Sequence, residues 1–416
     1  MLHRSVTRVT LATKQKREKV KAMKSILYGT TALVAVSLLA GTAGAAEKIK
    51  LGLGGYWRGV IHLGDSDNDA TTVATGKSDF RNHGFGQESE IYFSGKTTLD
   101  NGIKFGVMVQ LEGETSGDQI DNTYIWTAGS FGRVEFGETW GVSLMMSAGS
   151  IGDMLDGHGD FASHGAHANV NGQFIDTYGG DAGILATPEQ KITYFTPRMN
   201  GFQLGVSYVP ENNTGSASTT NTTATGLSSE VNGTIGSELV DIAANYVGKV
   251  GGTSVRVFGS FFTSESEATA VGVAAGKDVD GYSGGGQVGV GGFRIGGRYT
   301  KINDIAGPGA VPIAATADGL DRVNWRFGVD YGTGPWRVGV AYMRLEQEVA
   351  VAGVKGPRDD ETKYISLGGS YNLGPGIKMF GGLQVYDFQD STGGAGAAVA
   401  AEAENTVGMI GTKFSF

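Results

Sequence analysis

The sequence contains no cysteine, which excludes a disulfide framework and a thiolate metal site. It also lacks an excess of basic residues, because 42 Asp and Glu outnumber 33 Lys and Arg, and this argues against a nucleic-acid partner. After residue 45 no apolar run approaches the roughly 18 residues that a transmembrane helix needs. If the mature chain enters a membrane, it must therefore do so as a closed β-barrel.

One long apolar stretch does occur near the N-terminus, from Ile26 to Ala40. Ala43-Gly44-Ala45 follows it as an A-x-A cleavage pattern, which predicts a secretory signal peptide over residues 1–45 rather than a membrane anchor. Residues 46–416 then form a single barrel domain. Either the basic segment before Met23 belongs to the leader or translation starts at Met23, and the unusual length of that segment favours the second.

What the sequence does have is glycine, 70 of 416 residues, within segments that alternate apolar with polar side chains. Strict alternation is typical of strands with one face toward lipid and one toward water. Eight segments alternate clearly: 49–63, 103–112, 202–208, 254–261, 293–300, 322–331, 336–342 and 377–386. Eight weaker ones lie at 91–97, 124–128, 134–136, 192–196, 239–246, 282–290, 364–371 and 406–416. The pattern predicts sixteen strands.

Short turns and long polar segments alternate between these strands. Seven short turns contain Gly, Asn or Pro, which suit tight turns. The longer segments lie at about 64–86, 113–119, 139–189, 209–237, 264–281, 302–321, 346–361 and 388–403. This asymmetry predicts an all-β, sixteen-stranded antiparallel transmembrane barrel with short periplasmic turns and long external loops. Aromatic girdles are indicated by outward residues near strand ends: Trp57, Tyr208, Trp325, Tyr331, Trp336, Tyr342 and Tyr371.

Three places in the chain resemble the Gram-negative general porin family, of the alphaproteobacterial type. Gly129–Gly137 resembles the strand that leads into the family's constriction loop. Ile192–Pro197, with Gly201-Phe202 and Val206–Tyr208, resembles a mid-barrel hairpin. Gly411-x-x-Phe414-x-Phe416 resembles the C-terminal signal that the barrel-assembly machinery reads.

This resemblance implies a water-filled homotrimer in the outer membrane whose third external loop, here 139–189, folds inward and narrows the pore. It also implies Gly411, Phe414 and Phe416 as the assembly signal. The chain departs from the family in two ways. Glu138 stands where the family often has a basic residue, which puts anion preference in doubt. The second external loop, 113–119, is short, which weakens the case for a trimer.

The inward parity suggests which charges line the pore. The expected basic wall comprises Arg58, Lys104, Arg256, Arg298 and Arg326. The expected acidic side of the constriction comprises Asp153, Asp156, Asp160, Glu138 and Glu112. Opposed walls of this kind create a transverse field that screens solutes by size and charge. The plainer alternative is that these are ordinary solvated charges in a wet lumen, because alternation does not give their height along the pore.

No cofactor is expected. His158, His164 and His167 cluster beside Asp156 and Asp160, but their spacing fits no recognised metal motif. Weak binding of Ca²⁺ by external or constriction-loop acids is an open alternative.

The sequence therefore predicts a passive diffusion porin for small hydrophilic solutes and ions, mildly cation-preferring and not an enzyme. Its expected surroundings are outer-membrane lipid and lipopolysaccharide. A first alternative is a solute-selective, for example sugar-selective, porin with the inward residues Tyr56, Tyr92, Tyr364 and Tyr386. A remote alternative is a barrel enzyme built on His62, His83, Asp65, Asp67 and Asp69.

Overall fold

A computed structural model of the chain describes residues 48–68, 82–113, 120–149, 189–211, 237–266, 277–305, 320–351, 354–390 and 401–416. The predicted leader, with Ala43 and Ala45, lies outside these residues. The chain divides into two compact units, and the larger one, Ile49–Lys96 with Lys104–Phe416, carries the strands. In the smaller unit the structure describes Lys48 and a turn in which the Gly102 amide donates to the Leu99 carbonyl at 2.8 Å.

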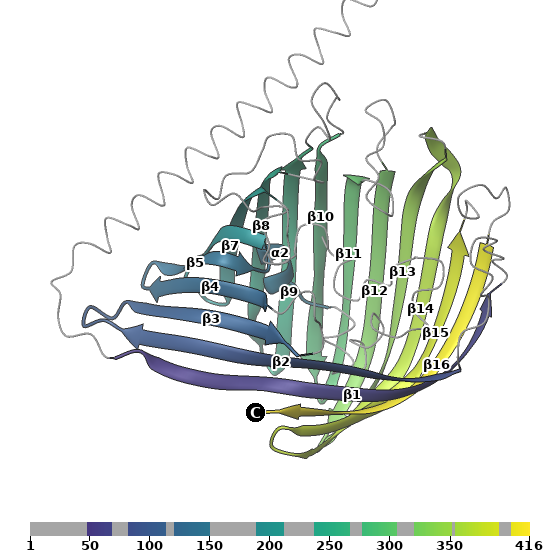
Figure 1. Ribbon diagram of the computed structural model, residues 1–416, viewed down its shortest axis with the longest axis horizontal. Coiled ribbons are helices and arrows are strands. Elements are labelled where there is room, and N and C mark those ends of the chain that lie inside the picture. Colours follow the sequence, from purple (N-terminus) through teal and green to yellow (C-terminus); the bar gives the residue numbers. More distant parts are fainter. Residues whose placement is uncertain are drawn as a thin grey trace, which may run out of the picture. The chain divides into compact units, whose positions relative to one another are not determined.

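The larger unit consists of strands that follow the predicted order (Figure 1). The first eight strands are β1 (Lys50–Asn68), β2 (His83–Thr98), β3 (Lys104–Glu112), β4 (Ile120–Gly129), β5 (Gly132–Thr139), β6 (Glu189–Phe195), β7 (Phe202–Glu211) and β8 (Ser237–Val250). The second eight are β9 (Thr253–Glu265), β10 (Val279–Val290), β11 (Phe293–Ile305), β12 (Leu320–Thr333), β13 (Trp336–Val351), β14 (Val354–Gly374), β15 (Ile377–Asp390) and β16 (Ala401–Ser415). The prediction of sixteen strands is confirmed.

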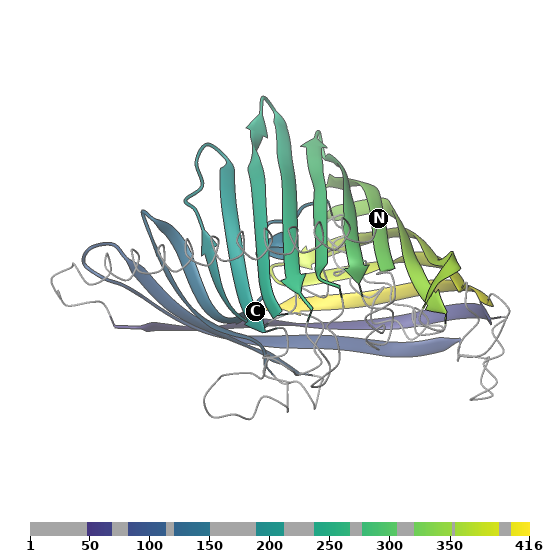
Figure 2. The ribbon, with the colours of Figure 1, turned by 90° about the horizontal axis from the view of Figure 1, so that it is seen from above.

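Each strand is hydrogen-bonded to its neighbours in sequence order, and β1 also pairs antiparallel with β16, so the barrel closes. Trp57 lies opposite Phe414 in that seam. Figure 2 shows the strands side by side around the barrel in a second view. Closure matters because lipid offers no partner to an unpaired strand edge, and a closed ladder has none.

The two faces of the wall separate apolar from polar side chains as predicted. Leu51 and Phe85 are 87% and 81% exposed on the outer face, where lipid covers them. Polar side chains such as Ser207, Asp241 and Ser366 are fully buried on the opposite parity. The inner face therefore lines the lumen, and the outer face has the apolar band that a membrane requires.

The short turns lie where they were predicted, and their glycines have the backbone conformation that such turns need. Gly201 and Gly376, for example, have φ of 92° and 74°, in a region that other residues rarely adopt. The short turns of the larger unit join strand ends on one side of the barrel, which is the periplasmic side in outer-membrane barrels.

One predicted loop is wrong in extent. The segment 346–361 was expected to be an external loop, but β13 continues to Val351 and β14 begins at Val354. Alternation of apolar residues did not reveal this extension because it carries charges, with Glu346 opposite Glu361. The Arg344 guanidinium bridges these two carboxylates at 2.7 and 3.2 Å, which stabilises the polar end of the hairpin.

A second difference lies just after β5, where only a loop was expected. Val142–Met145 forms one helical turn, α2. Among the described residues, no helix has the length and apolar character needed to cross a membrane.

Candidate functional site: the barrel lumen

The root of the third loop is bound to the inner face of the barrel wall. In α2, the Ser143 amide donates to Asp241 Oδ2 at 2.9 Å and the Val142 amide donates to Ser207 Oγ at 3.2 Å. After the helix, the Asn245 side-chain amide donates to the Met146 carbonyl at 3.0 Å. Asp241, Ser207 and Asn245 all belong to the inward parity of β7 and β8, so α2 lies inside the lumen.

Apolar packing strengthens this attachment. Val142 and Met146 are buried together with Phe195 of β6 and Ala243 of β8. Exclusion of water around the polar contacts makes each of them harder to replace by solvent, because an unsatisfied buried group is costly.

After the helix, the chain reaches the wall beyond β9, at β10 and β11. Gly149 has φ of 83°, and a Cβ placed on it would lie 2.6 Å from the Gly297 carbonyl of β11 and 2.9 Å from the Gly286 carbonyl of β10. Residues 140–149 therefore run from β5, past β7 and β8, to the wall at β10 and β11. The predicted inward fold is confirmed for this part of the third loop. Residues 150–188 lie outside the described residues, and with them Asp153, Asp156, Asp160, His158, His164 and His167.

Glu138 lies at the point where the loop leaves the wall. The alternation of β5 breaks at Gly137, whose φ is 131°, and the Glu138 side chain is 3% exposed. Lys191 on the neighbouring β6 is also buried and donates to the Thr139 carbonyl, with Glu138, Glu189 and Asp241 as charged neighbours. Glu138 thus belongs to a buried charged network at the loop root.

Two residues of the predicted basic wall lie side by side. Arg298 of β11 is in register with Arg326 of β12, and both are 3% exposed. Arg298 Nε donates to Ser283 Oγ at 3.0 Å, and its guanidinium carbon lies 4.8 Å from the centroid of the Phe258 ring. Arg326 Nε donates to Asn324 Oδ1 at 3.2 Å. The two guanidinium groups thus place two positive charges next to each other on the inner face of the wall.

The other predicted basic residues are placed apart from that pair. Arg58 is on β1, forms an ion pair with Glu88 of β2 and lies over the Tyr56 ring. Lys104 is the first residue of β3, and Arg256 is close to the start of β9, so both lie at the short-turn end. The structure therefore does not gather the five predicted basic residues into one wall.

Glu112, the remaining predicted acid, lies in a group with Glu90 and Asp121. One ligand oxygen from each of the three carboxylates lies within 4.8 Å of the others. Oxygen ligands of this kind suit Ca²⁺, although Asp121 already accepts a hydrogen bond from Gln110 at 2.8 Å. No cofactor is expected from the sequence, and weak calcium binding stays the open alternative.

The two histidines considered for the barrel-enzyme alternative differ in burial. His62 is buried on β1, and His83 is exposed at the start of β2, where its ring lies 2.9 Å from Asn82 Oδ1. The Asp65 side chain is exposed, whereas the side chains of Asp67 and Asp69 lie outside the described residues.

The contact of Asp241 with α2 was missed at the sequence level. A signal existed, because Asp241 stands on the inward parity between Val240 and Ile242 and is fully buried. Nothing in the local pattern, however, identifies a partner 98 residues away.

The C-terminal residues close the barrel. Phe414 and Phe416 are 44% and 68% exposed on the outer face, and Gly411 lies on the inner parity beneath the Phe380 ring. The Phe416 amide donates to the Gly55 carbonyl at 3.1 Å, and the Gly55 amide donates to the Phe416 carbonyl at 3.0 Å. Their role as an assembly signal stays a prediction.

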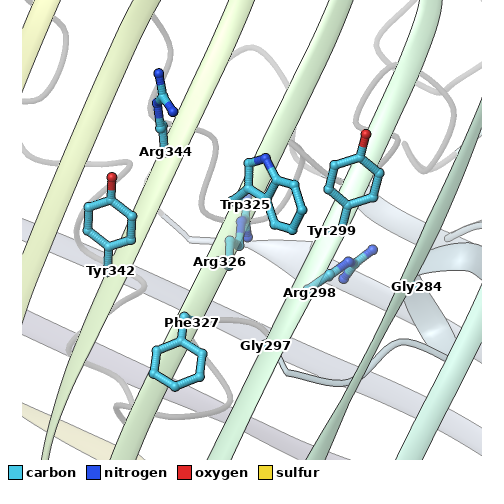
Figure 3. A pocket seen from close by; sticks show the side chains of 9 residues that line it. All are labelled: Gly284, Gly297, Arg298, Tyr299, Trp325, Arg326, Phe327, Tyr342 and Arg344. Carbon is cyan, nitrogen blue, oxygen red and sulfur yellow. The ribbon is translucent and has the colours of Figure 1, made fainter.

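A hollow of about 650 Å³ lies on the outer face of β10–β13 (Figure 3). Gly284 and Gly297 leave bare backbone there, among Tyr299, Trp325 and Tyr342. The Tyr299 ring centroid lies 4.4 Å from that of Trp325, which belongs to the predicted aromatic girdle, as does Tyr342. The aromatic rings that line this hollow lie on the outward parity, whereas Arg298 and Arg326, which also line it, belong to the inward parity.

Comparison with protein families gives one match. Residues 29–391 match a family model described as "Gram-negative porin". No curated protein matches the chain.

Solved structures give many matches, among them the following three. OmpT of Vibrio cholerae in its trimer form has a TM-score of 0.55 at 15% identity and covers 89% of this chain and 100% of its own. OmpF of Salmonella typhi, in complex with daunomycin, has a TM-score of 0.55 at 13% identity over 88% and 98%. The outer membrane channel DcaP of Acinetobacter baumannii has a TM-score of 0.54 at 14% identity over 90% and 100%. These likenesses show the fold.

Proposed function

From the premise that this chain belongs to the Gram-negative porin family, and so forms a channel in the outer membrane, we propose that it lets small hydrophilic solutes and ions diffuse passively. The observation that carries the proposal is the third loop, whose root lies against the inner wall at Asp241 and Ser207. A segment held against the inner wall narrows the polar lumen without blocking it. Such a narrowing sorts solutes by size and charge.

We further propose a mild preference for cations. The third loop carries Asp153, Asp156 and Asp160, and Glu90, Glu112 and Asp121 gather on the inner wall. The pair Arg298 and Arg326 offsets part of this charge. Only charges at the narrowing act strongly, because remote ones are screened beyond about 8–10 Å at physiological salt.

Recording of the purified protein in a planar bilayer under a salt gradient tests both statements. Stepwise conductance is expected, with a reversal potential that favours potassium over chloride. Replacing Asp153, Asp156 and Asp160 together by Asn should reduce or reverse that potential. Absence of steps would refute the channel, whereas a chloride preference in the unmodified protein would refute the charge assignment alone.

The proposed assembly is a homotrimer inserted by the barrel-assembly machinery and surrounded by lipid and lipopolysaccharide. One structurally similar protein, OmpT of Vibrio cholerae, is described as a trimer form. The mass of the protein in detergent, measured by light scattering, distinguishes a trimer from a monomer.

A second candidate function, selectivity for sugars, is favoured by the inward tyrosines. They form two pairs, because Tyr364 and Tyr386 have ring centroids 4.9 Å apart and Tyr56 and Tyr92 have theirs 6.4 Å apart. Tyr364 and Tyr386 are fully buried, so the surface that can contact the apolar face of a sugar ring is offered by the half-buried pair Tyr56 and Tyr92. Liposome swelling by a sugar and by a sugar alcohol of equal size should differ for a selective channel and agree for a general one.

A further inference from the structure

Basic side chains gather on the inner face of the barrel at the short-turn end. Six lysines on the inward parity lie near the strand ends on this side of the barrel, and Lys50 and Lys413 are placed there by pairing with Lys96 and Lys378: Lys50, Lys96, Lys104, Lys249, Lys378 and Lys413. Lys50 is opposite Lys96 in the β1–β2 register, so two like charges face the lumen side by side. Like charges directly opposite each other destabilise a sheet.

The few acidic side chains near the same turns form ion pairs with arginines. Arg133 pairs with Glu135 at 2.5 Å, and Arg294 pairs with Asp330 at 2.7 Å. Arg337 binds that same Asp330. Across the ranges that the structure describes, Lys96, Lys104 and Lys249 have no carboxylate within 4.0 Å, and their side chains are exposed. The inner surface at this end thus has a large positive excess.

The opposite end of the barrel has the opposite balance. Glu112 and Asp121 lie at the long-loop ends of β3 and β4, and their carboxylates group with that of Glu90 in the middle of β2. By sequence, the third loop adds five aspartates between 140 and 188 and no lysine or arginine. The charge of the lining therefore changes sign along the axis of the barrel, in addition to any transverse field at the narrowing.

We propose that the periplasmic half of the lumen is a vestibule that concentrates small anions, and that the channel consequently conducts better in one direction than in the other. This inference rests on the proposed function, because it requires an open channel. It concerns inorganic anions and small carboxylates or phosphates, whose charge the lysine side chains attract without a specific site. Charged walls of low dielectric focus such a field into the bore.

The direction follows from which ions each end admits. When the external side is positive, anions enter through the basic periplasmic end while cations enter through the acidic external end. Both then accumulate in the bore, so the conductance is high. With the external side negative, anions leave through the basic periplasmic end and cations leave through the acidic external end. The bore is then depleted of ions, so the conductance is low. We therefore expect the larger current with the external side positive.

Salt sets the size of this effect. The Debye length is about 30 Å at 0.01 M and about 3 Å at 1 M ionic strength, so the vestibule charge reaches across the bore only in dilute salt. With potentials of several kT in such a cleft, we expect a current ratio of roughly two-fold at about 100 mV in dilute potassium chloride, and a ratio near unity at 1 M.

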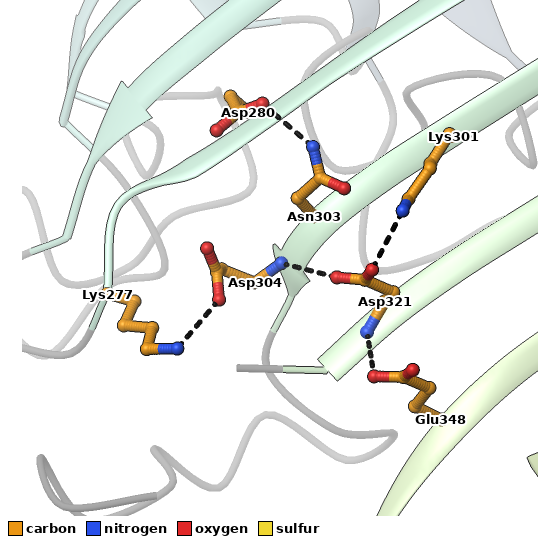
Figure 4. Close-up of polar contacts among 7 residues, drawn as sticks. All are labelled: Lys277, Asp280, Lys301, Asn303, Asp304, Asp321 and Glu348. Carbon is orange, nitrogen blue, oxygen red and sulfur yellow. Dashed lines mark hydrogen bonds and ion pairs between the residues drawn. The ribbon is translucent and has the colours of Figure 1, made fainter. Parts of the chain in front are cut away.

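The test compares the unmodified protein with a triple variant, Lys96→Gln, Lys104→Gln and Lys249→Gln. A control removes three lysines near the long-loop end by Lys277→Gln, Lys301→Gln and Lys363→Gln, of which Lys301 and Lys363 lie on the outward parity. These lysines form ion pairs with Asp304 at 3.2 Å, Asp321 at 2.9 Å and Glu361 at 2.6 Å, the first two of which are drawn in Figure 4. Ion pairs near the surface contribute little to stability, and the three vestibule lysines form no such pair with the described residues, so both variants should fold. The two variants change the total charge equally.

Orientation in the bilayer must be known for each channel. Because the chain has no cysteine, a single Asn372→Cys at the short-turn end gives a unique thiol. A membrane-impermeant thiol reagent added to one compartment then identifies the periplasmic side by the change in current that it causes.

The unmodified protein and the control should rectify in dilute salt, and the vestibule variant should lose most of the asymmetry while its channels still open. Symmetric currents from the unmodified protein in dilute salt would overturn the inference but leave the proposed function standing. An equal loss of asymmetry in the control would also overturn it, because total charge would then be the cause. Absence of any conductance would instead refute the proposed function.

Discussion

At the residue scale, Asp241 is the side chain on which the position of the third loop most depends. It accepts hydrogen bonds from the amide and hydroxyl of Ser143, and it is fully buried. Asp241→Ala leaves these donors unsatisfied, at a cost of about 1–3 kcal/mol. We expect a detached loop root, seen as higher and noisier single-channel conductance. Asp241→Asn keeps one acceptor oxygen and should change the conductance less; equal conductance in both variants and the parent would contradict the anchor.

Gly149 provides an independent residue-scale prediction, because its backbone touches the wall that the loop reaches. A Val side chain at this position is strained at φ 83° and would collide with the Gly297 carbonyl. Gly149→Val should therefore push the loop from β10 and β11 and alter conductance without loss of the barrel. Gly252→Ala is the control, since a Cβ there meets nothing within 4 Å. Conductance unchanged from that of the control would mean that the contact with the wall does not position the loop.

At the element scale, β16 closes the barrel through its last residue. Deletion of Phe416 removes the two backbone hydrogen bonds to Gly55 and an outward aromatic ring. We expect assembly to fail while export continues, so the truncated protein should appear in the periplasm and not in the outer membrane. The double variant Phe414→Ala, Phe416→Ala should show the same failure of assembly as the truncated protein. Leu373→Ala, another outward residue near a turn, serves as the control, and normal surface levels of the truncated chain would refute the signal.

The third loop as an element gives a further prediction. Deleting residues 150–165 removes three of its aspartates, Asp153, Asp156 and Asp160, but keeps the anchored root at 142–149. If the loop narrows the bore, single-channel conductance should rise while the protein still folds as a barrel. Conductance equal to that of the full chain would show that the deleted segment does not contribute to the narrowing.

At the scale of the whole molecule, the closed ladder predicts unusual resistance to detergent. Every strand is paired on both sides, so unfolding cannot begin from a free edge. The unboiled protein should run faster on gels than the boiled one, with a circular dichroism spectrum dominated by strands. A helix-rich spectrum would exclude the architecture, whereas a monomer in detergent would exclude only the trimer.

The sequence alone predicted the number of strands, their parity and the asymmetry of their connections. These properties are local, because side chains alternate with a period of two and turn residues act through their own φ angles. It failed where local rules end. The extension of β13 and β14 beyond Glu346 carries no apolar alternation, and α2 is too short to have a helical pattern.

Tertiary structure decided which charges meet. Strand register and barrel closure place Arg298 beside Arg326 but leave Lys104 and Arg256 at the periplasmic mouth. The contact between Ser143 and Asp241 joins residues 98 positions apart. Parity says only that a side chain faces water or lipid. Its height along the pore, and hence its effect on a passing ion, depends on pairings between distant segments that no local pattern encodes.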